Sequence, residues 1–144
     1  MESVGLAAIV TVLVVGTVAG VWHQRTSGRL HPAADDDQPD RVPAELLAEL
    51  GVPPSPVTLL QFSSAFCAPC RAVHRISSEV AAMIPGVHHV EIDAEGHLDA
   101  VRTLGIWRTP TLLVLAADGR VSRRATGVPT KPQLIAAIGE IHGA

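Results

Sequence analysis

Cys67 and Cys70 are separated by Ala68 and Pro69 and are the only cysteines of this 144-residue chain. A framework of structural disulfides is therefore excluded, and each sulfur atom can pair only with the other or with a sulfur of a partner protein. A disulfide that closes so short a loop would restrict the unfolded chain very little, so stabilisation alone explains the pair poorly. The spacing instead indicates thiol–disulfide exchange.

The two cysteines lie between an apolar segment, residues 57–62, and a segment with helical periodicity, residues 68–83. At the start of a helix, unpaired N–H groups and the helix dipole favour a thiolate, and the pKa values of such cysteines are roughly 3.5–7.5 against about 8.5 for a free cysteine. We therefore predict that Cys67 is the exposed nucleophile. Cys70, one helical turn further on, is predicted to be the buried resolving thiol that attacks the mixed disulfide. Pro69 suits the first turn of a helix.

A zinc site is the main alternative for these cysteines, because Cys67 and Cys70 would supply two of the four ligands that zinc needs. The remaining ligands would be His74, His88 or His89. The sequence contains no second C-x-x-C and no suitably spaced pair of histidines, so we expect no metal and no cofactor beyond the Cys67–Cys70 disulfide itself.

Strand and helix patterns alternate around the two cysteines. Four segments have the apolar runs or the alternation typical of strands, the last of them as an edge strand: residues 57–62, 86–93, 111–116 and 120–126. Four segments have helical periodicity or residues typical of helix ends: residues 43–51, 68–83, 97–105 and 131–142. This order predicts an α/β fold in which helices flank both faces of a central mixed β-sheet.

Residues 4–22 contain no charged residue and follow a short tail, residues 1–3. A helix of this length spans roughly 28 Å, close to the hydrocarbon thickness of a bilayer, which predicts an N-terminal transmembrane helix. A cleaved signal peptide is the alternative, but it would have a basic segment before a shorter apolar run. Arg25 and Arg29 follow the apolar segment, and by the positive-inside rule they favour a cytoplasmic domain. The prediction is a single-pass protein of the cell membrane.

Residues 23–42 contain Pro, Gly, Ser and an acidic run and show no apolar periodicity. We predict a disordered linker here, in which the acidic run at residues 35–37 is a solvated spacer rather than a metal site. The globular domain is predicted to comprise residues 43–144. The formal net charge of −3 shows no excess of basic residues, so nucleic acid is not an expected partner.

From about Val42 onward, four segments of the chain resemble the thioredoxin family in their order and spacing. They are VTLLQFSSAFCAPCR at residues 57–71, VEID at 90–93, GIWRTPTLLVL at 105–115 and TGVPTKPQL at 126–134. The resemblance implies the thioredoxin fold and a protein-disulfide reductase. It also implies two kinds of partner: proteins that carry disulfides, and an electron donor that the sequence does not identify.

The resemblance further implies a substrate-binding surface around the cysteines. Its residues would be Phe66, Ala68, Pro69, Trp107, Thr109, Pro110 and Gly127. The Thr109–Pro110 bond is expected to be a cis peptide that faces the disulfide. Gly127 would let a substrate chain approach, and Trp107 is expected either in the same groove or in the core.

Three departures from the family pattern concern proton transfer. Thioredoxins carry a buried Asp that relays the proton of the resolving thiol, whereas this chain has Gln61, whose amide does not titrate. The Lys that partners this Asp is replaced by His89, and a Pro of the active-site helix is replaced by Arg75. Our hypothesis is that His74, four residues after Cys70 on the same helix face, takes the proton, because an unperturbed His titrates near 6.5. The alternative is an ordinary surface histidine.

The Ala-Pro pair between the cysteines resembles the reducing end of the family more than the oxidising end. The favoured function is therefore the reduction or exchange of disulfides in protein partners. An extracytoplasmic thiol oxidase, or a thioredoxin of the cytochrome-maturation type, is the first alternative and requires the domain to face outside. A non-enzymatic binding module is a further alternative.

Overall fold

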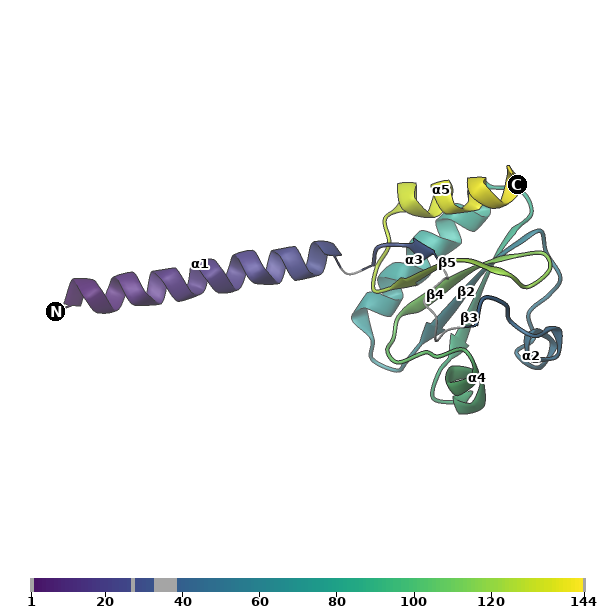
Figure 1. Cartoon of the computed structure of the whole chain (residues 1–144), viewed down its shortest axis with the longest axis horizontal. Helices are drawn as coiled ribbons and strands as arrows, with labels where there is room; N and C mark the ends of the chain where they lie inside the picture. The colour runs from purple at the N-terminus through teal and green to yellow at the C-terminus, as the bar shows by residue number, and fades with distance from the viewer. Residues whose placement is uncertain (1, 27, 33–38, 144) are drawn as a thin grey trace.

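The computed structural model describes residues 2–26, 28–32 and 39–143 of the chain (Figure 1). The helices are α1 (Glu2–Thr26), α2 (Ala44–Glu49), α3 (Ala68–Met83), α4 (Leu98–Thr103) and α5 (Lys131–His142). The strands are β1 (His31–Pro32), β2 (Val57–Ser63), β3 (Val87–Asp93), β4 (Thr111–Ala116) and β5 (Val121–Thr126). Every strand and helix that the sequence predicted in the globular part is present, with small shifts at the ends.

The five strands form one mixed sheet in the order β1-β5-β4-β2-β3, in which only β2 and β3 are parallel. Side chains alternate across this sheet: Leu59 packs with residues of α3 and α5, whereas Leu60 and Phe62 pack with residues of α4 and the end of α2. Figure 1 shows the same division, with α3 and α5 covering one face. The predicted mixed sheet with helices on both faces is confirmed.

Strand β2 is buried along its whole length because it lies between β4 and β3 and is covered on both faces. A strand buried on both faces needs a nearly continuous apolar sequence, which explains the run VTLLQF. Gln61 interrupts this run and is fully buried. The strand ends at Ser63, and a short turn leads from there to Cys67 and α3.

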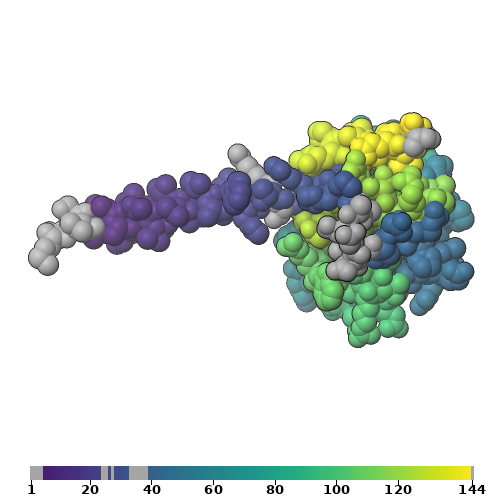
Figure 2. All heavy atoms as spheres, viewed as in Figure 1, coloured from purple at the N-terminus to yellow at the C-terminus, as the bar shows by residue number. Residues whose placement is uncertain are grey.

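Helix α1 projects from the domain as a rod (Figure 2). Its segment Gly5–His23 is long and apolar enough to cross a membrane, and none of it is buried. A single helix of this kind near an N-terminus has the properties of a membrane anchor and also those of a signal sequence.

Part of the predicted linker is ordered on the domain. Residues His31 and Pro32 form β1 and pair with Arg124 and Arg123 of β5, and the backbone N–H of Val42 donates to Gly119. The expectation of disorder is wrong for these residues, because backbone pairing with a free strand edge requires no apolar periodicity in the sequence. The acidic run at residues 35–37 lies outside the described residues.

Strand β5 is consequently not an edge strand, contrary to the expectation for residues 120–126. Besides β1, an isolated bridge joins Arg41 to Arg120. Arg124 is buried, and its Nη1 donates a hydrogen bond to the carbonyl of Leu104 at 2.9 Å. Burial lowers the pKa of this guanidinium.

Gly28 joins helix α1 to the sheet. Its backbone N–H donates to the carbonyl of Thr126 at 2.7 Å, and its φ of +87° is a conformation that side chains disfavour. A Cβ atom at this position would lie 2.2 Å from the carbonyl oxygen of Val128. Leu30, two residues further on, packs against the core on the α3 and α5 face. The segment after α1 is therefore held to the domain at Gly28.

We expect Gly28→Ala to detach this segment, because its Cβ atom would overlap the backbone of Val128. Limited trypsin digestion of the full chain in detergent should then cleave after Arg29 at least tenfold faster than in the wild type. Gly51→Ala is the matched control, since Gly51 also has a positive φ but has nothing within 4 Å of its missing Cβ atom. Equal cleavage in the two variants would contradict the role of Gly28.

Candidate active site

Cys67 and Cys70 form a disulfide at the start of α3, with their Cα atoms 5.2 Å apart. Cys67 is the N-cap residue, and its Sγ accepts a hydrogen bond from the backbone N–H of Cys70 at 3.2 Å. Pro69 lies in the first turn, where a missing N–H removes no helical hydrogen bond. Cys67 is partly exposed and Cys70 is buried, so a partner can reach the first sulfur and not the second.

The loops at the end of the sheet meet beside this disulfide. The Thr109–Pro110 bond is cis, as the family resemblance implied. The hydroxyls of Thr109 and Ser64 are hydrogen-bonded at 2.7 Å, and the N–H of Gly127 donates to the carbonyl of Pro110 at 3.0 Å. These contacts hold three loops together: the loop before α3, the loop before β4 and the loop after β5.

An open cavity of about 720 Å³ runs from the disulfide along α3. It is lined by Ser63, Ser64, Phe66, Cys67, Cys70, Arg71, His74, Arg75, Ser78, Glu79 and Glu91. Phe66 is fully exposed and has a φ of +59°. Trp107 is 90 % exposed, which excludes the core position that was one of its two expected places. It lines a different cavity, with Gly105 and Arg108 among its neighbours.

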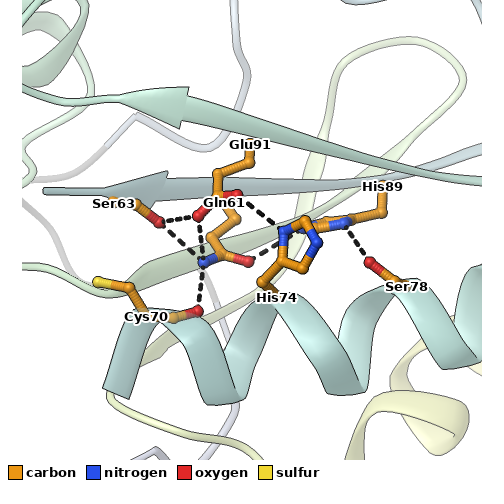
Figure 3. A network of polar contacts seen from close by, with 7 residues as sticks. All are labelled: Gln61, Ser63, Cys70, His74, Ser78, His89 and Glu91. Atoms are coloured by element: carbon orange, nitrogen blue, oxygen red, sulfur yellow. Dashed lines mark hydrogen bonds and ion pairs between the residues drawn. The ribbon is translucent and has the colours of Figure 1, made fainter. Parts of the chain in front are cut away.

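Gln61 lies at the centre of a buried hydrogen-bond network beneath Cys70 (Figure 3). Its Nε2 lies 2.8 Å from Ser63 Oγ, 2.9 Å from the carbonyl oxygen of Cys70 and 3.2 Å from Glu91 Oε1. Its Oε1 accepts a hydrogen bond from His89 Nε2 at 3.0 Å. Because that nitrogen donates, Nδ1 of a neutral His89 accepts a hydrogen bond from the hydroxyl of Ser78 at 3.1 Å.

Glu91 connects this network to the protein surface. Its Oε1 accepts a hydrogen bond from the hydroxyl of Ser63 at 2.6 Å, and its Oε2 lies 2.7 Å from Nδ1 of His74. The His74 side chain is 52 % exposed and that of Glu91 is 35 % exposed. The rings of His74 and His89 meet edge to face with centroids 5.1 Å apart. A carboxylate and an exposed imidazole therefore lie in the same cavity as Cys70.

Comparison with known proteins agrees with this geometry. The family model described as "Thioredoxin" matches residues 47–140. The chain belongs to the thioredoxin family. It is a redox protein of that family with a cysteine pair that forms a disulfide, and its fold is the thioredoxin fold.

Individual thioredoxins resemble parts of the chain. Thioredoxin M3 of rice chloroplasts (Oryza sativa subsp. japonica) is 33% identical over 81 residues, which is 56% of this chain and 46% of the rice protein. Thioredoxin of Chlamydia muridarum is 27% identical over 86 residues, covering 60% of this chain and 83% of that protein. The chain thus spans about half the length of the rice relative. The structure of chloroplastic thioredoxin z superposes with a TM-score of 0.59 at 22% identity, covering 74% of this chain and 96% of that one.

Within the thioredoxin fold of this chain, the acid that thioredoxins place on β2 is absent, and Glu91 on β3 supplies the carboxylate of the network. The sequence interpretation missed Glu91. The signal was available in the strand periodicity, because His89 and Glu91 are two residues apart on one face of β3. The parallel register pairs Glu91 with Gln61. Among the described residues, no group of three or more His, Cys, Asp or Glu side chains is arranged to hold a metal ion.

Burial lowers the pKa of His89 from about 6.5 to about 4, with a smaller contribution in the same direction from His74 and an opposing one from Glu91. Between pH 6.5 and pH 4, His89 is therefore protonated in the unfolded chain and neutral in the folded chain. The free energy of unfolding should therefore be at its full value above pH 6.5 and fall as the pH decreases towards 4.

We expect His89→Asn to remove this part of the pH dependence. In urea denaturation, the loss of stability between pH 7.5 and pH 5 should be smaller than in the wild type by about 1 kcal/mol, since solvent screens a half-buried ring. His88→Asn, at the exposed neighbouring position, is the control and should keep the wild-type dependence. An unchanged dependence in His89→Asn would show that His89 is not held neutral by the fold.

Proposed function

We propose that the chain is a membrane-anchored protein-disulfide reductase. The observation that supports this most strongly is the unequal position of the two sulfur atoms. Cys67 is accessible, and its sulfur accepts a hydrogen bond from the backbone N–H of Cys70 at the start of α3, which favours the thiolate of Cys67. Cys70 is buried one helical turn further on. The first sulfur is therefore suited to attack a partner, and the second to complete the reaction within the same protein.

The reaction begins with the reduced dithiol. The Cys67 thiolate attacks one sulfur of the partner's disulfide, forms a mixed disulfide and releases the partner's other sulfur as a thiolate. Cys70 then loses its proton and attacks the sulfur of Cys67, which releases the second thiolate of the partner. Two electrons pass from Cys67 and Cys70 to the partner, and the Cys67–Cys70 disulfide forms. An electron donor must reduce this disulfide before the next cycle.

The proton of Cys70 needs an acceptor, because Gln61 beneath it does not titrate. Glu91 is the carboxylate of the network, and its contact with His74 links it to solvent. In our proposal Glu91 and His74 act together: the carboxylate orients the imidazole, and the proton leaves through the exposed ring. Ser63 and Gln61 hold the carboxylate in place.

The proposal includes the side of the membrane on which the domain lies. Helix α1 is taken as a retained anchor, and Arg25 and Arg29, which follow its apolar span Gly5–His23, favour a cytoplasmic domain. A topology reporter fused after residue 144 tests this side. The reducing direction is supported by Ala68 and Pro69 between the cysteines, which resemble the reducing members of the family.

Substitution of the cysteines separates the two steps. We expect Cys67→Ser to lower insulin reduction by the full chain in detergent to the uncatalysed rate. Cys70→Ser should instead accumulate a covalent mixed disulfide through Cys67, visible on a non-reducing gel and removed by dithiothreitol. Catalysis by Cys67→Ser, or trapping through Cys70, would contradict the assigned roles.

The relay is tested by the pH profile of the second step. We expect Glu91→Gln and His74→Ala to slow resolution of the mixed disulfide by roughly 10- to 100-fold at pH 7. The rate should then rise with pH towards that of an unassisted thiol, near pH 8.5. The reaction is followed by rapid acid quench, and His88→Ala on β3 is the control. Profiles that coincide with the wild type would leave Glu91 and His74 as surface residues.

A further inference from the structure

The chain leaves the domain towards α1 at the end of the sheet that carries the disulfide. Backbone pairing aligns Phe62 of β2 with Thr111 of β4 and Thr111 with Thr126 of β5. Gly28 then bonds to Thr126. Gly28 and the end of β2 are thus three strand spacings apart, about 14 Å, at the same level of the sheet. Figure 1 shows α1 leaving the domain at the end where α3 begins.

The connection between the apolar span and this attachment point is short. The span ends at His23, and five residues further on the backbone of Gly28 is hydrogen-bonded to β5 and lies close to the backbone of Val128. Even fully extended, five residues reach at most about 18 Å. The helix continues to Thr26, which shortens this reach because a helix rises only about 1.5 Å per residue.

Rotation of the domain about this connection does not move the disulfide out of reach of the membrane. The attachment point is itself at the active-site end, so rotation changes the direction of the disulfide from Gly28 but not its distance from Gly28. Adding the reach of the connection to the distance across the sheet places the end of β2, four residues before Cys67, within roughly 32 Å of the end of the span. The opposite end of the sheet, with the turn between β4 and β5, extends away from it (Figure 1).

The surface at the active-site end carries two exposed aromatic side chains. Phe66 precedes the nucleophile, and Trp107 lies in the loop that leads to Pro110. The hydrogen bonds from Gly127 to Pro110 and between Thr109 and Ser64 join these loops into one surface that begins at the anchor. Exposed aromatic residues suit contact with an apolar partner surface.

We propose that this protein acts on disulfides carried by integral membrane proteins within a few residues of the bilayer surface, on the side where its domain lies. The inference rests on the proposed reductase function and on retention of α1. The exchange is the same: the membrane protein's disulfide is reduced to two thiols and the Cys67–Cys70 dithiol is oxidised. The short connection raises the effective concentration of Cys67 for disulfides near the membrane and prevents it from reaching distant ones.

The test uses the reduced full chain in proteoliposomes with two synthetic transmembrane peptides. One peptide carries a disulfide loop three residues from its span. The other carries the same loop on a rigid helical spacer that places it about 60 Å from the bilayer. We expect the near loop to be reduced at least tenfold faster. Insertion of 30 Gly-Ser residues after Thr26 should reduce this preference to less than twofold, while insulin in solution is reduced equally by both chains.

The outcomes separate the two proposals. Equal reduction of the near and far loops by the wild-type chain, with insulin still reduced, would overturn the membrane-proximal substrate and leave the reductase function standing. Failure to reduce insulin would contradict the reductase function itself. The placement of the site has a readout that needs no activity. In Trp22→Phe, whose one remaining tryptophan is Trp107, energy transfer from Trp107 to dansyl-labelled lipid headgroups should be strong and should decrease in the chain with the insertion. Absence of transfer would overturn the placement.

Discussion

The burial of β2 on both faces is the constraint on which the site depends. A strand in this position pairs all its backbone groups with its neighbours, and any polar side chain on it must find partners inside the protein. Gln61 is such a side chain. Its amide is satisfied by Ser63, the Cys70 carbonyl, Glu91 and His89. The buried amide thus connects the first turn of α3 to β3 and fixes the two histidines and the carboxylate relative to Cys70.

In this chain Gln61 stands where thioredoxins have a buried Asp, and the negative charge of the network lies instead on Glu91 of β3. Burying a charged carboxylate costs free energy unless the carboxylate is paired, and burial raises the pKa of the carboxyl group. Here the carboxylate belongs to Glu91, which is partly exposed and adjacent to His74. The buried position is therefore neutral, and the carboxylate of this network is one that water can reach.

Much of the fold could be predicted from the sequence because local patterns carry it. The apolar run at residues 57–62 and the helical spacing at residues 68–83 reflect burial of particular faces, and both elements appear as expected. The cis bond before Pro110 followed from family resemblance rather than from local pattern. The pairing of His31 and Pro32 with β5 was missed, because backbone hydrogen bonds depend on position and not on side-chain type. Strand periodicity places Glu91 on the same face as His89, but its pairing with Gln61 is determined by strand register, and Glu91 was missed for that reason.

The pairing of β1 with β5 also has a consequence for the order of biosynthesis. During translation the segment at residues 28–32 emerges early, soon after the apolar span, whereas its partner strand at residues 121–126 is among the last parts of the domain to be made. Until β5 has formed, the early segment lacks its pairing partner, and the connection between the apolar span and the domain is longer. Completion of the sheet shortens that connection. The spacing between the apolar span and the active-site end is therefore defined only in a molecule that has finished folding.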